Sequence, residues 1–149
     1  YPLRRQRQMC IRDRVRGREV ELDTGSGAVT GSGLAADAIR VDTGSGAVEL
    51  MAVSSPDLHL DTGSGSVEVE LLSDVESLWV DTGSGTVVLH LPADLGAQVE
   101  VDTGSGGIDV DLPLEITEVR RDFLRGVLGD GRGSLRVDTG SGRIRLLAR

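Results

Sequence analysis

The stretch VDTGSGAVEL, residues 41–50, decides the fold of this chain. Its central pentapeptide DTGSG occurs six times in the 149 residues, beginning at Asp23, Asp42, Asp61, Asp81, Asp102 and Asp138. The intervals between successive copies are 19, 19, 20, 21 and 36 residues. A nearly constant period of about 20 residues predicts a repeat architecture in which each copy contributes one structural unit.

Apolar and polar residues alternate on both sides of each copy. Ile39 and Val41 precede the second copy, and Val48 and Leu50 follow it. This period of two indicates β-strands, and the helical spacing i, i+3, i+4 is missing. Each unit is therefore predicted to be a strand, a DTGSG corner, a second strand and a looser turn such as residues 54–57.

Two architectures fit alternating strands at this spacing: an antiparallel meander or barrel, and a solenoid of stacked rungs. Identical corners at a fixed period favour the solenoid, because stacking places equal residues above one another about 4.8 Å apart. A propeller is excluded because its blades need roughly 40 residues each. The sequence thus predicts an all-β fold, a single-domain parallel β-solenoid (β-helix) with about 20 residues per rung. We expect right-handed winding, and each rung stacked on the one before it.

Three segments are distinguished along the chain. Residues 1–14, YPLRRQRQMCIRDR, are basic, lack the repeat, and are interpreted as non-native or disordered. Residues 15–149 are predicted to form the solenoid, with residues 118–137 as an irregular rung with a loop. Because the solenoid then begins inside a strand near Val15, its open end is expected to favour self-association.

The alternation also assigns the residues of the motif. If Val41 points inward, Asp42 points outward and Thr43 inward. The aspartate is expected to accept hydrogen bonds from the following backbone N–H groups in an Asx-turn, and the threonine hydroxyl to stack on the threonine of the next rung. The glycines permit a positive φ at the bend.

Charge is unevenly distributed in this chain of net charge −8. Between Glu19 and Glu115 the one basic residue is Arg40, against nineteen acids, whereas residues 118–149 hold eight arginines and four acids. An acidic body argues against nucleic acid as a partner, since phosphate contacts need clustered cations. With Cys10 as the only cysteine, neither an intrachain disulfide nor a thiolate zinc site can form.

Three motifs in the sequence resemble motifs that carry chemistry in other proteins. Asp-Thr-Gly resembles an aspartic-protease tripeptide, but that chemistry needs two carboxylates sharing one proton in a cleft, whereas six copies form a ladder. The glycine-rich residues 25–33 lack the following helix that a dinucleotide-binding loop requires. Stacked Asp42, Asp61, Asp81 and Asp102 could recruit a cation such as calcium, and this stays open as the less favoured alternative.

His59, His90 and Trp79 occupy outward strand positions. The histidines are interpreted as isolated, solvated side chains. Trp79 is expected to be covered by a loop or a neighbouring chain, with contact to a sugar ring as the alternative. No catalytic, cofactor-binding or metal-binding residue and no cofactor is predicted.

Rungs of the form Val-Asp-Thr-Gly-Ser-Gly-x-Val-x-Leu resemble the bacterial "putative adhesin" family of β-strand-repeat proteins, a family of unknown function. The resemblance covers residues 15–149, and VLGDGRGSLRVDTGSGRIRL, residues 127–146, looks like the closing part of that domain. It implies a secreted or membrane-anchored envelope protein, and it brings no catalytic residues.

These observations together predict a non-catalytic, adhesin-like module outside the cell or in the cell envelope. Its partner is expected to be an envelope protein or a surface ligand, and any membrane contact to come from an anchor upstream of residue 1. One alternative is a carbohydrate-active β-helix enzyme, which needs an acid cluster beside Arg or Lys in a groove. The other is a scaffold for envelope-stress signalling that binds through the basic segment around Arg120–Gly133.

Overall fold

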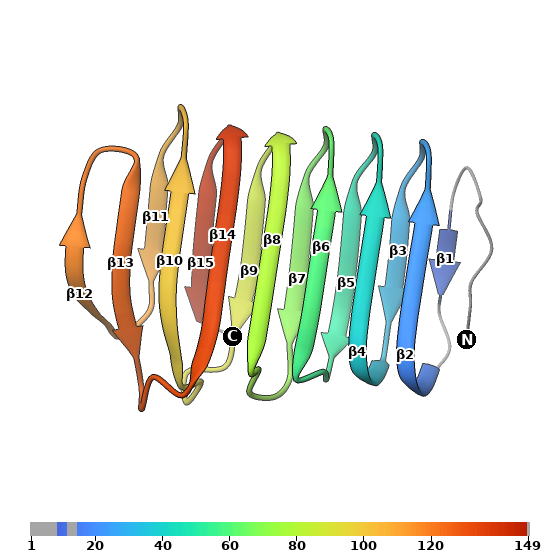
Figure 1. Cartoon of the computed structure of the whole chain (residues 1–149), viewed down its shortest axis with the longest axis horizontal. Helices are drawn as coiled ribbons and strands as arrows, with labels where there is room; N and C mark the ends of the chain where they lie inside the picture. The colour runs from blue at the N-terminus through green and yellow to red at the C-terminus, as the bar shows by residue number, and fades with distance from the viewer. Residues whose placement is uncertain (1–8, 12–14, 149) are drawn as a thin grey trace.

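The computed structural model describes residues 9–11 and 15–148, which form two β-sheets stacked face to face along a common axis (Figure 1). We call them sheet A, the front layer in Figure 1, and sheet B, the rear layer. All fifteen strands belong to one of the two sheets, and the described residues contain no helix.

Sheet A has eight strands and sheet B has seven. In spatial order, sheet A contains β12 (Leu114–Val119), β13 (Phe123–Leu128), β10 (Ala97–Thr103), β14 (Gly133–Ser141), β8 (Ser77–Ser84), β6 (Asp57–Thr62), β4 (Leu34–Thr43) and β2 (Val15–Thr24). Sheet B contains β1 (Met9–Ile11), β3 (Val29–Ser32), β5 (Val48–Val53), β7 (Val67–Leu71), β9 (Val87–Leu91), β15 (Ile144–Ala148) and β11 (Ile108–Asp111).

Each rung climbs one strand of sheet A, turns at a DTGSG corner and descends one strand of sheet B. Neighbouring rungs pair in parallel with the motif in register, as in Asp42↔Asp61 and Thr43↔Thr62. The prediction of an all-β parallel solenoid is therefore confirmed, and the antiparallel barrel is excluded. The right-handed winding stays a prediction.

The order of the rungs differs from the expected one. The first four motif-bearing rungs stack in sequence order, but the last rung, β14 and β15, lies between the fourth and fifth: β14 pairs with β8 on one side and with β10 on the other. The last strand of the chain, β15, consequently lies in the interior of the stack and not at its end (Figure 1). The expectation that each rung stacks on its predecessor was wrong here, because six equivalent corners fix the register of a pair without fixing which rungs form it.

The 36-residue interval holds the segment that makes this insertion possible. Strands β12 and β13 form an antiparallel hairpin, and β13 also pairs antiparallel with β10 at the end of sheet A. The chain then crosses beneath β10 and enters the slot beside β8. Residues 118–137, expected as an irregular rung with a loop, thus comprise the end of β12, all of β13 and the first half of β14.

The core is a set of aliphatic ladders between the sheets. Inward residues such as Leu22, Val41, Leu60, Val80 and Val137 are completely buried. Burying such a side chain contributes about 1.5–3 kcal/mol, so stacked aliphatic residues can stabilise a core with almost no aromatic rings. Outward residues between them form straight rows across each sheet, and these rows are the surfaces on which function must be sought.

At the other end of the stack, β1 continues sheet B within the segment 1–14 that was set aside, while β2 is the edge strand of sheet A among the described residues. The rest of that segment lies outside the described residues. Nowhere in residues 9–11 and 15–148 is there a helix of the length and apolarity needed to cross a bilayer.

Candidate functional site

The DTGSG corners follow one another in a straight line along the axis of the stack, which we call the seam. Their threonines form hydrogen bonds within it. Thr24, Thr43, Thr62, Thr82, Thr103 and Thr139 are all at most 1% exposed. The Thr82 hydroxyl donates a hydrogen bond to the carbonyl oxygen of Ser84 at 3.2 Å, and most other corners repeat this bond. The predicted inward threonine is therefore confirmed, and threonines of neighbouring rungs are paired in register, as in Thr43↔Thr62. The Thr103 hydroxyl differs from the others because it donates to the carbonyl oxygen of Gly142 in the neighbouring rung.

The glycines of the seam permit close stacking. Gly46 and Gly65 have φ of +126°, a region that favours glycine. A Cβ at Gly63 would lie 2.5 Å from the carbonyl oxygen of Gly44 in the rung beside it. Six nearly identical corners can thus pack with their backbones in contact.

The seam carries a row of six aspartates in the spatial order Asp23, Asp42, Asp61, Asp81, Asp138 and Asp102. None of these carboxylates accepts a hydrogen bond from the corner backbone in the described structure, so the expected Asx-turn was wrong. The side-chain hydrogen bond of the corner comes instead from the threonine hydroxyl, which donates to the serine carbonyl oxygen two residues later. Burial, then the neighbouring Asp138 and Asp61, raise the pKa of Asp81. Among the described residues no group of three or more His, Cys, Asp or Glu side chains has a geometry that could hold a metal ion.

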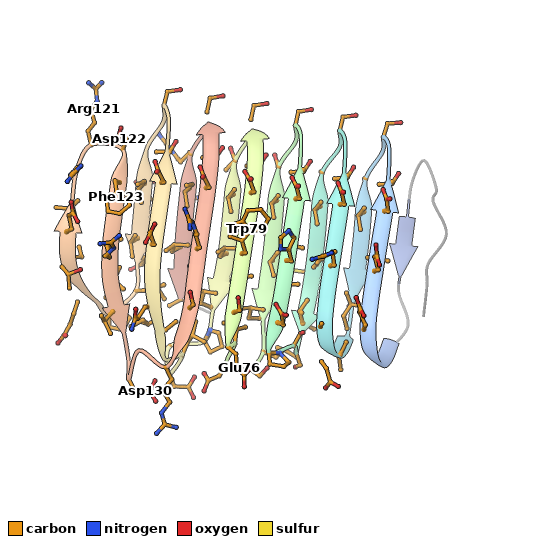
Figure 2. All side chains as sticks on the ribbon, in the orientation of Figure 1. Glu76, Trp79, Arg121, Asp122, Phe123 and Asp130 are labelled. Atoms are coloured by element: carbon orange, nitrogen blue, oxygen red, sulfur yellow. The ribbon has the colours of Figure 1, made fainter. Side chains whose placement is uncertain are left out.

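A second outward row crosses the middle of sheet A two residues before the aspartates. We call it the central row, and it consists of Glu21, Arg40, His59, Trp79, Arg136, Glu100, Arg125 and Glu118. Each residue is paired in register with its neighbours on the adjacent strands. Trp79 lies half-buried near the middle of the sheet face, and no loop among the described residues covers it (Figure 2).

The two rings of the central row are in contact. The centroids of His59 and Trp79 are 4.0 Å apart and their planes are tilted by 46°. Burial, followed by the charge of Arg40, lowers the pKa of His59 below its ordinary value of 6.5. The interpretation of His59 as isolated was therefore wrong, and at neutral pH its ring is uncharged.

Arginines flank this pair on both sides. Arg40 is the in-register neighbour of His59, and Arg136 that of Trp79. In the part of the chain that the structure describes, neither forms an ion pair, whereas Arg125 in the same row binds Glu100 at 3.1 Å. Two guanidinium groups beside the rings thus keep donors for an external partner.

Two shallow hollows lie on either side of Trp79. One, of about 230 Å³, is lined by Glu19, Arg40, Asp57 and His59 together with backbone of β4. The other, of about 160 Å³, is lined by Gln98, Glu100, Arg125, Ser134 and Arg136 with backbone of β10 and β14. Both hollows mix carboxylates with guanidinium groups.

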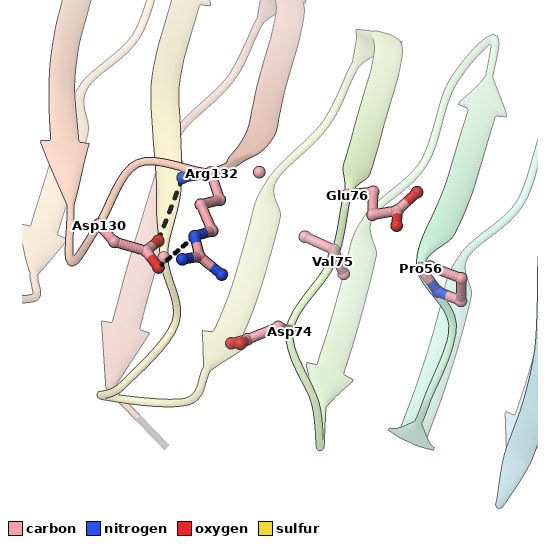
Figure 3. Close-up of a pocket in the computed structure, with 8 residues that line it drawn as sticks. Pro56, Asp74, Val75, Glu76, Asp130 and Arg132 are labelled. Carbon is pink, nitrogen blue, oxygen red and sulfur yellow. Dashed lines mark hydrogen bonds and ion pairs between the residues drawn. The ribbon is translucent and has the colours of Figure 1, made fainter.

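The base of the solenoid, opposite the corners, holds a larger cavity of about 620 Å³ (Figure 3). It lies where the last rung enters the stack, next to the crossing segment. Asp130 accepts hydrogen bonds from the Arg132 backbone N–H at 3.1 Å and pairs with its guanidinium at 3.2 Å. Asp74 and Glu76 also line it, but their side chains point apart in Figure 3. The cavity follows from the crossing of the loops and holds no converging set of reactive groups.

Two further sites with charged side chains form ion pairs that the sequence did not predict. His90 on the outer face of sheet B contacts Glu68 at 3.1 Å, so its interpretation as isolated was also wrong. Arg121 and Asp122 lie at the tip of the β12–β13 hairpin (Figure 2), and Arg120 there pairs with Glu118 at 2.7 Å. Part of the basic charge of the C-terminal region is therefore already neutralised.

The sequence contains a signal for the central row that was missed. Aligning the six repeats on their aspartates places Glu21, Arg40, His59, Trp79, Glu100 and Arg136 in a single column. What the alignment lacks is the spatial order, which brings Arg136 next to Trp79 and separates Glu100 from it. Only the inserted last rung gives the ring pair an arginine on both sides.

Comparisons with known proteins agree with this architecture. No curated protein matches the chain. A crystal structure described as a "putative cell adhesion protein" from Clostridium sporogenes matches with a TM-score of 0.59 and 16% identity over 75% of this chain. The match covers 55% of that protein, so the chain spans about half its length, and the likeness concerns the fold alone. The family model described as Toastrack DUF4097 matches residues 10–147, and so the chain belongs to the Toastrack DUF4097 family.

Proposed function

We propose that this chain is a non-catalytic binding module of the cell surface or envelope that presents the outer face of sheet A to its ligand. The observation that carries this proposal is the central row, where a half-buried Trp79 and two arginines that form no ion pair with the described residues face outward. The protein with which this chain shares its fold is described as a "putative cell adhesion protein", and the proposed role agrees with that description.

The arrangement of acids supports a non-catalytic role over a carbohydrate-active enzyme. Glycoside hydrolysis needs two carboxylates facing each other across the scissile bond. On sheet A the carboxylates of the seam are side by side on parallel strands and point the same way. The hollow that combines Glu19, Asp57 and Arg40 has a volume of about 230 Å³, below the roughly 300–1,000 Å³ of ordinary ligand pockets.

The expected partner is an envelope protein or a surface ligand, and the acidic solenoid body disfavours nucleic acid. Surface location and attachment to a membrane through an additional segment are part of the proposal. Self-association through the open ends also belongs to it, because β2 and β12 are edge strands in the described residues.

An adhesion assay tests this function. Microspheres coated with the chain are passed over bacterial envelope preparations and over extracellular matrix, and their retention under flow is measured. We expect retention well above that of microspheres coated with albumin, and a reduction when soluble chain competes. Retention equal to the albumin control on every surface would contradict the proposal.

A second function, a scaffold for envelope-stress signalling, is favoured by the exposed hairpin tip. The Arg121 side chain extends beyond the sheet and lines a cavity of about 340 Å³ with Asp122 and residues 104–106 (Figure 2). Deleting residues 120–133 would be a poor test because this removes β13 and displaces β14. We expect the double variant Arg120→Ala/Arg121→Ala to keep the fold, because both side chains are exposed. Loss of a co-purifying envelope protein in this variant alone would support the scaffold.

A further inference from the structure

We propose that the central row of sheet A binds an uncharged glycan chain, with one sugar ring stacked on Trp79 and the hydroxyl groups of the neighbouring rings bound in the two flanking hollows. This inference rests on the proposed function and names its ligand class. Four observations carry it: the ring pair, the two arginines that have no ion pair within residues 9–11 and 15–148, the mixed polarity of the hollows and the straightness of the row.

Trp79 supplies the stacking surface. It is the only tryptophan of the chain, and it lies half-buried on the face of the sheet and not in the core. The His59 ring lies against the indole, with ring centroids 4.0 Å apart, and supports it on that side. Aromatic side chains offer large, rigid apolar surface, which suits the apolar face of a pyranose ring.

The hollows supply hydrogen bonds of both kinds. Arg40 and Arg136 offer donors on opposite sides of Trp79, and Asp57 and Glu100 offer acceptors in the same two hollows. A hydroxyl group is both donor and acceptor, so a polyhydroxylated ligand satisfies this mixture on both sides. Because Arg125 is already paired with Glu100, the free donors are concentrated next to the rings.

Charged ligands fit the surface less well. A polyanion on Trp79 would run beside the aspartate row of the seam, where Asp61 and Asp81 lie two residues beyond His59 and Trp79. A polycation would meet Arg40 and Arg136 on the row itself. An extended peptide is disfavoured too, because the backbones of β6 and β8 are hydrogen-bonded on both sides and offer no free edge for strand addition.

The row defines the direction and length of the ligand. From Arg40 on β4 to Arg136 on β14 there are three strand steps, which correspond to about 14 Å at the usual strand spacing. A chain of several sugar rings lying across the strands would cover this distance, whereas a single ring would reach only one hollow. Affinity should therefore increase with chain length and level off once the row is covered.

The single tryptophan gives a direct measurement. Its emission is recorded during titration with cellohexaose, maltohexaose and a β-1,3-linked glucohexaose, and with the corresponding disaccharides. Polygalacturonate and chitosan oligomers serve as anionic and cationic probes. We expect at least one neutral hexasaccharide to shift the Trp79 emission with an affinity at least about tenfold above that of its disaccharide, and both charged probes to bind more weakly.

Variants locate the site, with binding measured by calorimetry and affinity electrophoresis. Trp79→Ala should weaken binding at least about tenfold, and Trp79→Phe should restore part of it. Arg40→Ala and Arg136→Ala should each weaken it roughly fivefold. Val88→Ala is the matched control, because Val88 faces outward on sheet B in the same rung and lies away from the central row. Circular dichroism confirms the fold of each variant.

Three results would overturn the inference: no emission shift with any neutral hexasaccharide, tighter binding of a charged probe, or equal affinity of Trp79→Ala and the unmodified chain. Each of them can be told apart from failure of the adhesion function. If microspheres coated with Trp79→Ala are still retained, the module binds surfaces through another ligand; if unmodified microspheres are not retained, the adhesion function itself is wrong.

Discussion

The first four rungs stack in the order of the sequence, and the last two rungs do not. From β2 to β9, neighbours in the sequence are neighbours in the stack, whereas β10 and β11 are separated from β8 and β9 by the last rung of the chain. Both regions have the same register, as Asp61↔Asp81 and Asp81↔Asp138 show. The difference teaches that position in the stack, and not position in the sequence, decides how much each rung contributes.

Removing a rung at either end of the sequence should therefore have unequal effects. Deletion of residues 133–149 takes away an interior rung with two interfaces, including the fully buried Leu135, Val137, Ile144 and Leu146. At about 2 kcal/mol for each side chain this approaches the whole stability of a typical domain. We expect this chain to lose cooperative unfolding in urea, followed by circular dichroism.

Deletion of residues 1–32 is the matched control, because it removes an end rung and one interface. We expect that chain to unfold cooperatively at a lower urea concentration. Equal midpoints for the unmodified chain and the chain ending at Arg132 would contradict the comparison. They would mean that β8 and β10 pair directly when the last rung is missing.

The same contrast applies to one glycine of the motif. Gly63→Ala brings a Cβ to 2.5 Å from the backbone oxygen of Gly44, whereas a Cβ at Gly25, the same motif position in the first rung, meets nothing within 4 Å. We expect a loss of about 2 kcal/mol or more in the free energy of unfolding for Gly63→Ala. Gly25→Ala should change it by less than about 0.5 kcal/mol. Similar losses for both would show that the corner conformation, and not stacking, requires glycine.

Much of this architecture could be predicted from the sequence, because each copy of the repeat determines the strands and the corner of its own rung. The alternation around Val41 and Val48 fixes which side chains are buried, and the constant period fixes the register. The order of the rungs could not be predicted, since every copy of the motif can pair equally well with every other. The β12–β13 hairpin determines this order. Because β13 pairs antiparallel with β10, the chain returns to the base of the stack, where β14 can enter between β8 and β10.

The candidate site was predictable to a lesser degree. The outward position of Trp79 followed from the alternation, but its contact with His59 needed the alignment of one rung on the next. The neighbour on its other side, Arg136, comes from a segment 57 positions later in the sequence and depends wholly on the inserted rung. Sequence reasoning therefore found the residue and missed its surroundings.

An aspartate in the interior of the seam should lower the free energy of unfolding at pH 7 more than an aspartate at the end of the seam. Asp81 lies between Asp61 and Asp138, and burial together with these charges raises its pKa. A raised pKa in the folded state means that its contribution to stability is present at low pH and is lost as the pH rises through that pKa. Asp81→Asn should therefore stabilise the chain at pH 7 by about 0.5 kcal/mol and flatten the fall in stability that accompanies the rise of pH above 3.8.

Asp23→Asn provides the comparison, because Asp23 is at the end of the row and has one neighbour, Asp42. Its effect at pH 7 should be smaller than that of Asp81→Asn, and both effects should shrink in 1 M salt as the charges are screened. An equal gain from both substitutions would indicate that repulsion along the row is negligible. Thermal unfolding at several pH values measures all of these differences.

The smallest expected effect concerns His59 in the middle of sheet A. Burial and then Arg40 lower its pKa, so the fold favours the neutral ring; the associated stability is present above pH 6.5 and is lost as the pH falls through the lowered value. Because the ring contacts Trp79, its protonation should quench the tryptophan emission with a midpoint below 6.5. Arg40→Ala should move this midpoint upward, and His90→Ala on sheet B should leave it unchanged. A midpoint at or above 6.5 would mean that the central row is more open to water than its packing implies, and that a ligand gains less by covering it.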